Sequence, residues 1–164
     1  MTEDRREQLR RALEANTTRR RRPLIRDAVQ AIVPAGVSET AFQSISDTEA
    51  LQDFVEGKVG EPGTSRTRWT MDLMSGALQA VASYSATPGP VLLVPRSERP
   101  AEAVELQDCS VLAVPEQLIA AVPYFALVSP DRSLGLAFDW GWRDYEGEWA
   151  ELATWGPIGG TWAS

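Results

Sequence analysis

Aromatic and acidic side chains are concentrated near the carboxyl end of this 164-residue chain. Five aromatic residues and four carboxylates lie between Phe138 and Trp149, and five of the six tryptophans lie at or after Trp140. Three kinds of chemistry use these residue types. Paired carboxylates cleave glycosidic bonds while indoles stack on sugar rings, aromatic and charged side chains form protein contact surfaces, and aromatics at alternating strand positions fill a core.

The catalytic interpretation depends on Glu146 and Glu148. These two carboxylates would point to the same side of a strand, roughly 6.5–7 Å apart along the backbone. Close carboxylate pairs are common, and the domain is small for a cleft that cleaves sugars. A carboxylate-dependent hydrolase is therefore only the third hypothesis.

Protein contact suits the segment better. Tyr and Trp supply rigid contact area, and flanking carboxylates select a basic partner. Trp142 and Tyr145 fall in the expected turn of a hairpin, where burial is hardest. We therefore expect a non-catalytic acidic interaction module, comparable in design to immunity proteins, antitoxins or adaptors, which binds a basic protein through Trp142, Arg143, Asp144, Tyr145, Glu146 and Glu148.

Two other interpretations stay open. In a small-ligand-binding regulatory or sensor domain, the aromatic residues would line a pocket between a sheet and its helices. In the plainest interpretation the same residues are core, because Leu134, Leu136, Phe138 and Trp140 would share one face of a strand.

Several familiar site types are excluded by composition. The chain has no histidine, which removes Ser-His, Cys-His and His-metal arrangements. Its single cysteine, Cys109, removes intramolecular disulfides and cysteine-based zinc sites, and Asp108 beside it would raise the thiol pKa. No glycine loop has the setting of a phosphate cradle. We expect no cofactor and no metal.

The net charge of −7 divides unevenly along the chain. Residues 1–26 hold nine arginines and four acidic residues, 9 − 4 = +5, whereas residues 27–164 hold seven basic and nineteen acidic residues, 7 − 19 = −12. An acidic body favours a basic partner over nucleic acid. Nucleic-acid contact is expected only through the arginine run, and no aromatic residue in 1–41 offers stacking there. That run consists of Arg19, Arg20, Arg21 and Arg22.

The sequence shows no secretory leader and no run of the ~18–20 apolar residues that a membrane span needs. The expected protein is cytoplasmic, with a free thiol and no membrane contact. Its oligomeric state does not follow from the sequence.

The first third of the chain is expected to be helical. Apolar spacing and capping residues predict helices over 3–15, over 23–33 after an arginine-rich connector, and over 46–57 behind a capping box of Ser46 and Glu49. Residues 58–68, rich in Gly, Pro, Ser and Thr, are predicted to form a loop or linker.

The remainder, 69–164, is expected to be an α+β region. The pattern predicts a helix over 67–85, buried strands at 91–94 and 111–114, and a short helix from Pro115. A hairpin of 124–129 and 134–140 and a strand at 148–155 would form a C-terminal meander. The expected fold is thus α+β: short N-terminal helices, then a mostly antiparallel sheet with one or two helices packed on one face, in one compact unit.

Overall fold

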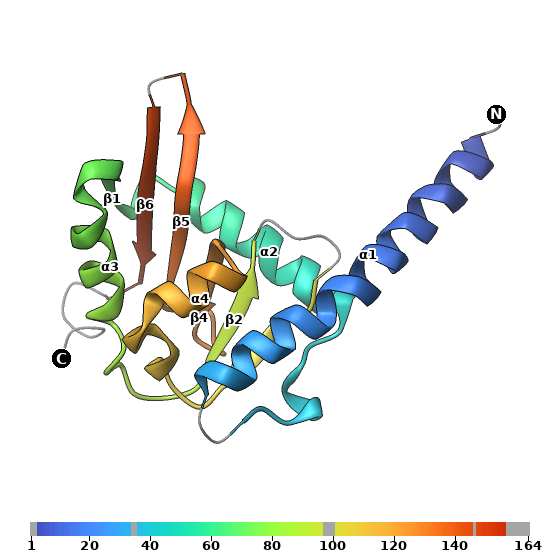
Figure 1. Ribbon diagram of the computed structural model, residues 1–164, viewed down its shortest axis with the longest axis horizontal. Coiled ribbons are helices and arrows are strands. Elements are labelled where there is room, and N and C mark those ends of the chain that lie inside the picture. Colours follow the sequence, from blue (N-terminus) through green and yellow to red (C-terminus); the bar gives the residue numbers. More distant parts are fainter. Residues whose placement is uncertain (1–2, 34–35, 97–100, 146, 157–164) are drawn as a thin grey trace.

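The computed structural model describes residues 3–33, 36–96, 101–145 and 147–156. For residues 14–15, 17–25, 142 and 144 it describes the backbone but not the side chain. Figure 1 shows the arrangement of the elements. The α-helices are α1 (Glu3–Ile32), α2 (Ile45–Gly60), α3 (Met74–Ala82) and α4 (Pro115–Ala121), joined by short 3₁₀ turns η1 (Glu39–Ala41), η2 (Met71–Leu73) and η3 (Ser110–Ala113). The strands are β1 (Ser65–Thr70), β2 (Val91–Pro95), β3 (Val104–Leu106), β4 (Tyr124–Val128), β5 (Gly135–Asp144) and β6 (Gly147–Trp155).

The strands form one antiparallel sheet in the order β1-β6-β5-β4-β2-β3. The α+β class, with N-terminal helices followed by an antiparallel sheet, is confirmed. The predicted meander is present as β4-β5-β6, because each of these strands pairs with the next along the chain.

Helices pack against both faces of the sheet. One face carries Leu93, Phe125, Leu136 and Phe138, which pack with buried residues of α1, α3 and α4 such as Val29. The other face carries a smaller cluster in which α2 packs on the strands, made of Leu51, Val55, Val94, Ala103, Ala126, Val128, Ala137, Ala153 and Trp155. The predicted sharing of one face by Leu134, Leu136, Phe138 and Trp140 is confirmed.

The N-terminal region differs from its prediction. Instead of two helices and a connector, residues 3–32 form a single helix, so the arginine run 19–22 lies inside a helix. Arginine is a good helix former, and the expected break at Pro23 does not occur. The next helix begins earlier than predicted, because Ser44 rather than Ser46 caps it, accepting a hydrogen bond from the Asp47 amide at 3.0 Å.

Two further segments were wrongly assigned from the sequence. Residues 65–70, expected as loop and helix, form the edge strand β1, and only 61–64 stay irregular between α2 and β1. Residues 111–114, expected as a strand, lie in and just after the 3₁₀ turn η3. Both segments are short, and their conformation depends on partners distant in sequence: β1 pairs along β6 from Thr154 to Trp149.

The loop between β4 and β5 is closed by Asp131. Its carboxylate accepts hydrogen bonds from the Ser133 amide at 3.0 Å and from the Ser129 hydroxyl at 2.6 Å. These bonds hold the pKa of Asp131 down at about 2. The four-residue loop predicted from the sequence is therefore organised by one side chain.

Within the described ranges, every helix is too short or too polar to cross a bilayer.

Candidate interaction site on the β5–β6 hairpin

The far end of the β5–β6 hairpin projects beyond the rest of the sheet (Figure 1). Strand β4 pairs with β5 only as far as Asp139, and β1 pairs with β6 only as far as Trp149. Trp140 donates one more backbone hydrogen bond, to the Pro123 carbonyl at 3.0 Å. Residues 142–148, which we call the hairpin tip, are reached by neither β4 nor β1, and the register printed for them joins β5 to β6 alone: Trp142 to Trp149, Arg143 to Glu148 and Asp144 to Gly147.

A β-bulge separates the tip from the core part of the hairpin. The register shifts between Asp139 and Trp142, and Gly141 at this point has φ 73°. Glycine adopts this conformation without the steric cost that a side chain brings. Trp140, before the bulge, packs on Phe138 with 6.2 Å between ring centroids. Trp140 is thus partly buried and packs against the core, on the face that the plainest interpretation of the sequence expected.

Two described side chains of the tip, those of Arg143 and Tyr145, are open to solvent. Tyr145 is 95 % exposed, the highest value among the exposed large hydrophobic and aromatic residues. Arg143 and Glu148 face each other across the two strands and form an ion pair at 2.9 Å. Exposed ion pairs contribute little to stability, so these two side chains can exchange partners at small cost.

Five of the six predicted contact residues have a described backbone in the tip. Arg143, Tyr145 and Glu148 lie at the tip with their side chains described. Trp142 and Asp144 lie in β5, paired with Trp149 and Gly147, and their side chains are outside the description. Glu146 falls outside the described residues.

At the base of the hairpin, charged residues follow one another across the sheet. Asp139 and Glu151 are directly opposite on β5 and β6, and Arg68 on β1 is opposite Glu151. Arg68 pairs with Glu151, and Arg96, which follows β2, pairs with Asp139. We call these four residues the charged row.

Two contacts tie the charged row to its surroundings. Arg96 also reaches Glu56 of α2, at 3.0 Å, and the Arg68 guanidinium lies over the Trp149 ring, 4.6 Å from its centroid. Burial raises the pKa of Asp139 above its ordinary value, and the neighbouring Arg96 opposes this rise without cancelling it. Because Arg96 and Arg68 neutralise Asp139 and Glu151, the row has the organisation of a structural ion-pair network.

The charged row was missed from the sequence. The partners Arg68 and Glu151 are 83 residues apart, and Arg96 and Asp139 are 43 apart. The one local signal was Glu151, a carboxylate between Trp149 and Ala153 on a strand otherwise patterned as core. A charge at such a position implies a basic partner.

Of the two carboxylates on which the hydrolase hypothesis depends, Glu148 forms an ion pair with Arg143, and Glu146 lies outside the described residues. Among the described side chains, no group of three or more potential metal ligands occurs. Cys109 is fully buried, and burial, with a contribution from Asp108, raises its pKa to about 12.

A hollow of about 700 Å³ lies away from the hairpin, between the segment after α1 and the segment joining β3 to η3. Among the described residues that line it, none is aromatic. Its lining is made of Val33, Gly36, Val37, Ser38, Thr40, Ala41, Pro90, Glu105, Leu106, Gln107, Asp108, Ser110 and Val111.

Comparisons of the chain with protein-family models, with curated proteins and with solved structures found no match.

Proposed function

We propose that this protein is a non-catalytic interaction module that binds a basic partner protein through the hairpin tip. The observation that carries the proposal is the isolation of the tip: two strands extend beyond their neighbours and present Tyr145 almost completely to solvent. Tyrosine is among the residues that contribute most to the binding energy of protein contacts, and the ring of Tyr145 is available for such a contact.

Charge defines the class of partner. Residues 142–148 carry one arginine and three carboxylates, 1 − 3 = −2, and residues 27–164 as a whole carry 7 − 19 = −12. A negative surface of this kind accelerates the encounter with a cationic protein and disfavours polyanions. The rigid base of the hairpin, held by the charged row and by Trp140, would keep the tip ordered before binding and so reduce the entropy lost on association.

Peptide selection tests the proposal without a known partner. A random peptide library is panned against the wild-type protein and against Tyr145→Ala, whose fold should be unaffected because the side chain is exposed. We expect the wild-type protein to enrich basic peptides and Tyr145→Ala to lose them. Ile45→Ala removes an exposed side chain at the start of α2, just after Phe42 bridges to β3 at the sheet edge opposite β1 and β6, and is the matched control. Equal enrichment by Tyr145→Ala, or enrichment without basic character, contradicts the proposal.

Arg143→Ala provides a second test, in which peptide binding should become tighter rather than weaker. Removing this guanidinium releases Glu148 and makes the tip more negative. Enriched basic peptides should bind Arg143→Ala more tightly than wild type at low salt, and the gain should disappear at high salt. Weaker binding would mean that Arg143 itself contacts the partner, against the charge argument.

Binding of a small ligand is the second candidate, and the hollow beside α1 favours it. Glu105 and Asp108 in its lining would select a cationic compound. Spermidine should raise the melting temperature of the wild-type protein and have less effect on Glu105→Gln; no shift with spermidine removes this candidate. The cytoplasm is the proposed compartment for either function, on the basis of the single free thiol of Cys109.

A further inference from the structure

The N-terminal part of α1 projects from the body as an arm (Figure 1). At 30 residues, α1 is on the order of 45 Å long. Within residues 3–13, which we call the arm, every side chain is exposed except Glu7, which is partly exposed. A helix without tertiary packing is only marginally stable in water, so the arm would gain stability from a surface to pack on.

The surface of the arm combines apolar and basic side chains. Leu9 and Leu13 are 49 % and 66 % exposed, and their i,i+4 spacing puts them on one side of the helix. Glu7 pairs with Arg10 at 2.7 Å and with Arg11 at 3.1 Å, which neutralises part of the arginine charge. The partner of this surface must therefore supply apolar contact as well as negative charge.

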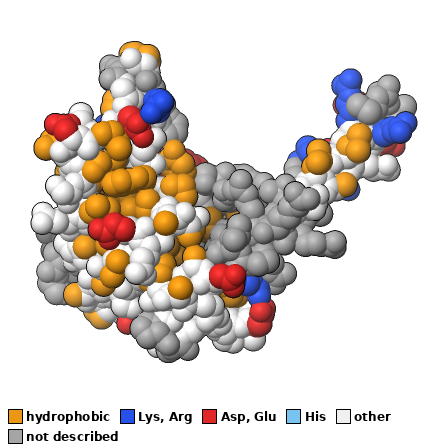
Figure 2. Space-filling model, viewed as in Figure 1, with side chains coloured by type: hydrophobic (Ala, Val, Ile, Leu, Met, Phe, Trp, Pro, Cys, Tyr) orange, Lys and Arg blue, Asp and Glu red, His pale blue; other side chains and the backbone are white. Residues whose placement is uncertain are grey.

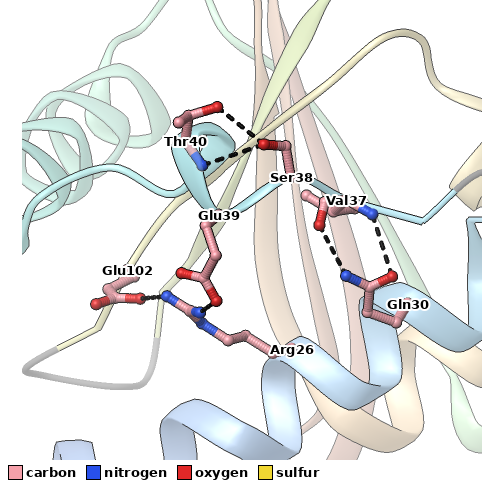
Figure 3. Close-up of polar contacts among 7 residues, drawn as sticks. All are labelled: Arg26, Gln30, Val37, Ser38, Glu39, Thr40 and Glu102. Atoms are coloured by element: carbon pink, nitrogen blue, oxygen red, sulfur yellow. Dashed lines mark hydrogen bonds and ion pairs between the residues drawn. The ribbon is translucent and has the colours of Figure 1, made fainter.

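The C-terminal part of α1 packs on the body through both apolar and basic side chains. Val29 is fully buried, and α1 packs on α4. Figure 3 shows Arg26 between two carboxylates of the body: it pairs with Glu39 and lies 3.3 Å from Glu102. Its guanidinium also lies over the Phe42 ring, 4.1 Å from the centroid. Basic residues of α1 and acidic, aromatic residues of the body are thus complementary within one chain.

The body offers a matching surface on the side that faces the viewer in Figure 2. Hydrophobic side chains gather there over α3, β5 and β6, with acidic residues around them. Trp69, Leu78 and Trp140 are only partly buried on this side of the sheet. Met71 and Leu73, in the turn before α3, are 42 % and 55 % exposed. We call these five residues the apolar face.

We propose that the arm of one copy docks on the apolar face of a second copy, so that two chains exchange arms reciprocally. Charge complementarity favours this arrangement: the arm itself carries four arginines and three carboxylates, 4 − 3 = +1, the segment 1–26 that bears it sums to +5, and residues 27–164 sum to −12, so this end of α1 and an acidic body attract each other. Leu9 and Leu13 favour a protein surface over a polyanion as the partner of the arm, because a phosphate backbone offers leucine no apolar contact. A reciprocal exchange closes the assembly as a two-fold dimer.

Sedimentation analysis of the full chain from about 5 µM to about 200 µM tests the proposal. The wild-type protein should reach twice the mass of the 18.0 kDa chain. Leu9→Glu with Leu13→Glu, on the arm, and Leu73→Glu, on the apolar face, should each remain monomeric. Raising the salt from about 50 mM to about 500 mM should weaken the wild-type dimer on the order of tenfold.

Two controls separate this proposal from the function proposed for the hairpin. Ile45→Glu alters an exposed apolar residue at the start of α2, which packs on the opposite face of the sheet, and Tyr145→Ala alters the tip. Both variants should dimerise like wild type, whatever the outcome of peptide selection.

Three results would overturn the exchange of arms. One is a wild-type protein that stays monomeric throughout the concentration range. Another is loss of the dimer in the arm variant but not in Leu73→Glu, which indicates contact between arms. The third is a monomer that binds duplex DNA or anionic vesicles through residues 1–26, which assigns the basic helix to a polyanion.

Discussion

Side chains in the hairpin divide into two groups by their partners. Asp139 and Glu151 are held by arginines from distant parts of the chain, whereas Tyr145 has an almost fully exposed ring. The first group fixes the position of the hairpin, and the second is available for contact. Alternating aromatic and acidic residues in the sequence pointed to the segment but did not separate these roles, because the arginines that engage the base are 43 and 83 residues away.

Cys109 should be chemically inert in the folded protein. Its side chain is buried and its pKa is raised to about 12, so almost no thiolate exists at pH 8. A disulfide-exchange reagent should label Cys109 only after denaturation in urea. The matched control is Ser110→Cys, which places a thiol at the exposed neighbouring position and should react in the native state. Rapid native labelling of the wild-type protein would show that this region opens readily.

Asp131 should make stability depend on acid pH. Its pKa in the folded protein, about 2, lies below the ordinary value of 3.8, because the ionised carboxylate accepts hydrogen bonds from Ser129 and Ser133. The stabilisation is therefore complete above pH 3.8 and is lost as the pH falls towards 2. Asp131→Asn should unfold at lower urea concentration than wild type at pH 7, and the difference should shrink as the pH falls. A difference that is independent of pH would rule out the charged hydrogen bonds as its source.

Elements were predictable from the sequence where local pattern and tertiary context agree. The β4–β5 hairpin, β6, β2 and α4 follow from alternation, apolar runs and a proline in the first turn of α4. Strand β1 was missed because Ser65–Thr70 has no apolar alternation and forms a strand only by pairing with β6. The run at 111–114 was assigned as a strand because a short apolar stretch fits a buried strand and a buried turn equally well.

Pro23 tests the continuity of α1. Inside a helix, proline lacks the amide hydrogen that would bond to the carbonyl four residues earlier, at Arg19. Pro23→Ala should therefore raise the helical signal in far-UV circular dichroism and stabilise α1 by up to ~3 kcal/mol. Pro115→Ala is the control with the opposite expectation, since Pro115 lies in the first turn of α4, where proline is favourable. A neutral or destabilising effect of Pro23→Ala would support two separate helices.

The whole molecule depends on a sheet that is covered on both faces. The sequence predicted helices on one face, and α3 and α4 provide that layer. The second layer, α2, could not be assigned to the opposite face from its own pattern, because an amphipathic helix does not reveal which surface it packs on. Small residues such as Ala126, Ala137 and Ala153 on that face make room for α2.

Leu51→Ala tests the contribution of this second layer. Leu51 belongs to α2, is 3 % exposed, and packs in the cluster between α2 and the sheet. Its truncation should lower the free energy of unfolding by about 2–5 kcal/mol, as measured by urea denaturation. Glu49→Ala, at an exposed position of the same helix, should have little effect. Equal stabilities of Leu51→Ala and wild type would mean that α2 is not part of the cooperative unit.

At the scale of the whole molecule, the proposed function requires that the hairpin tip be a contact surface for a basic protein. Its most direct test is the affinity of one selected basic peptide for wild type and for Tyr145→Ala, measured by fluorescence anisotropy at the same salt concentration. We predict a dissociation constant at least about tenfold higher for Tyr145→Ala, as for an aromatic residue central to an interface. A change of less than about twofold, with the peptide still bound by the protein, would show that the peptide does not bind through Tyr145 at the hairpin tip.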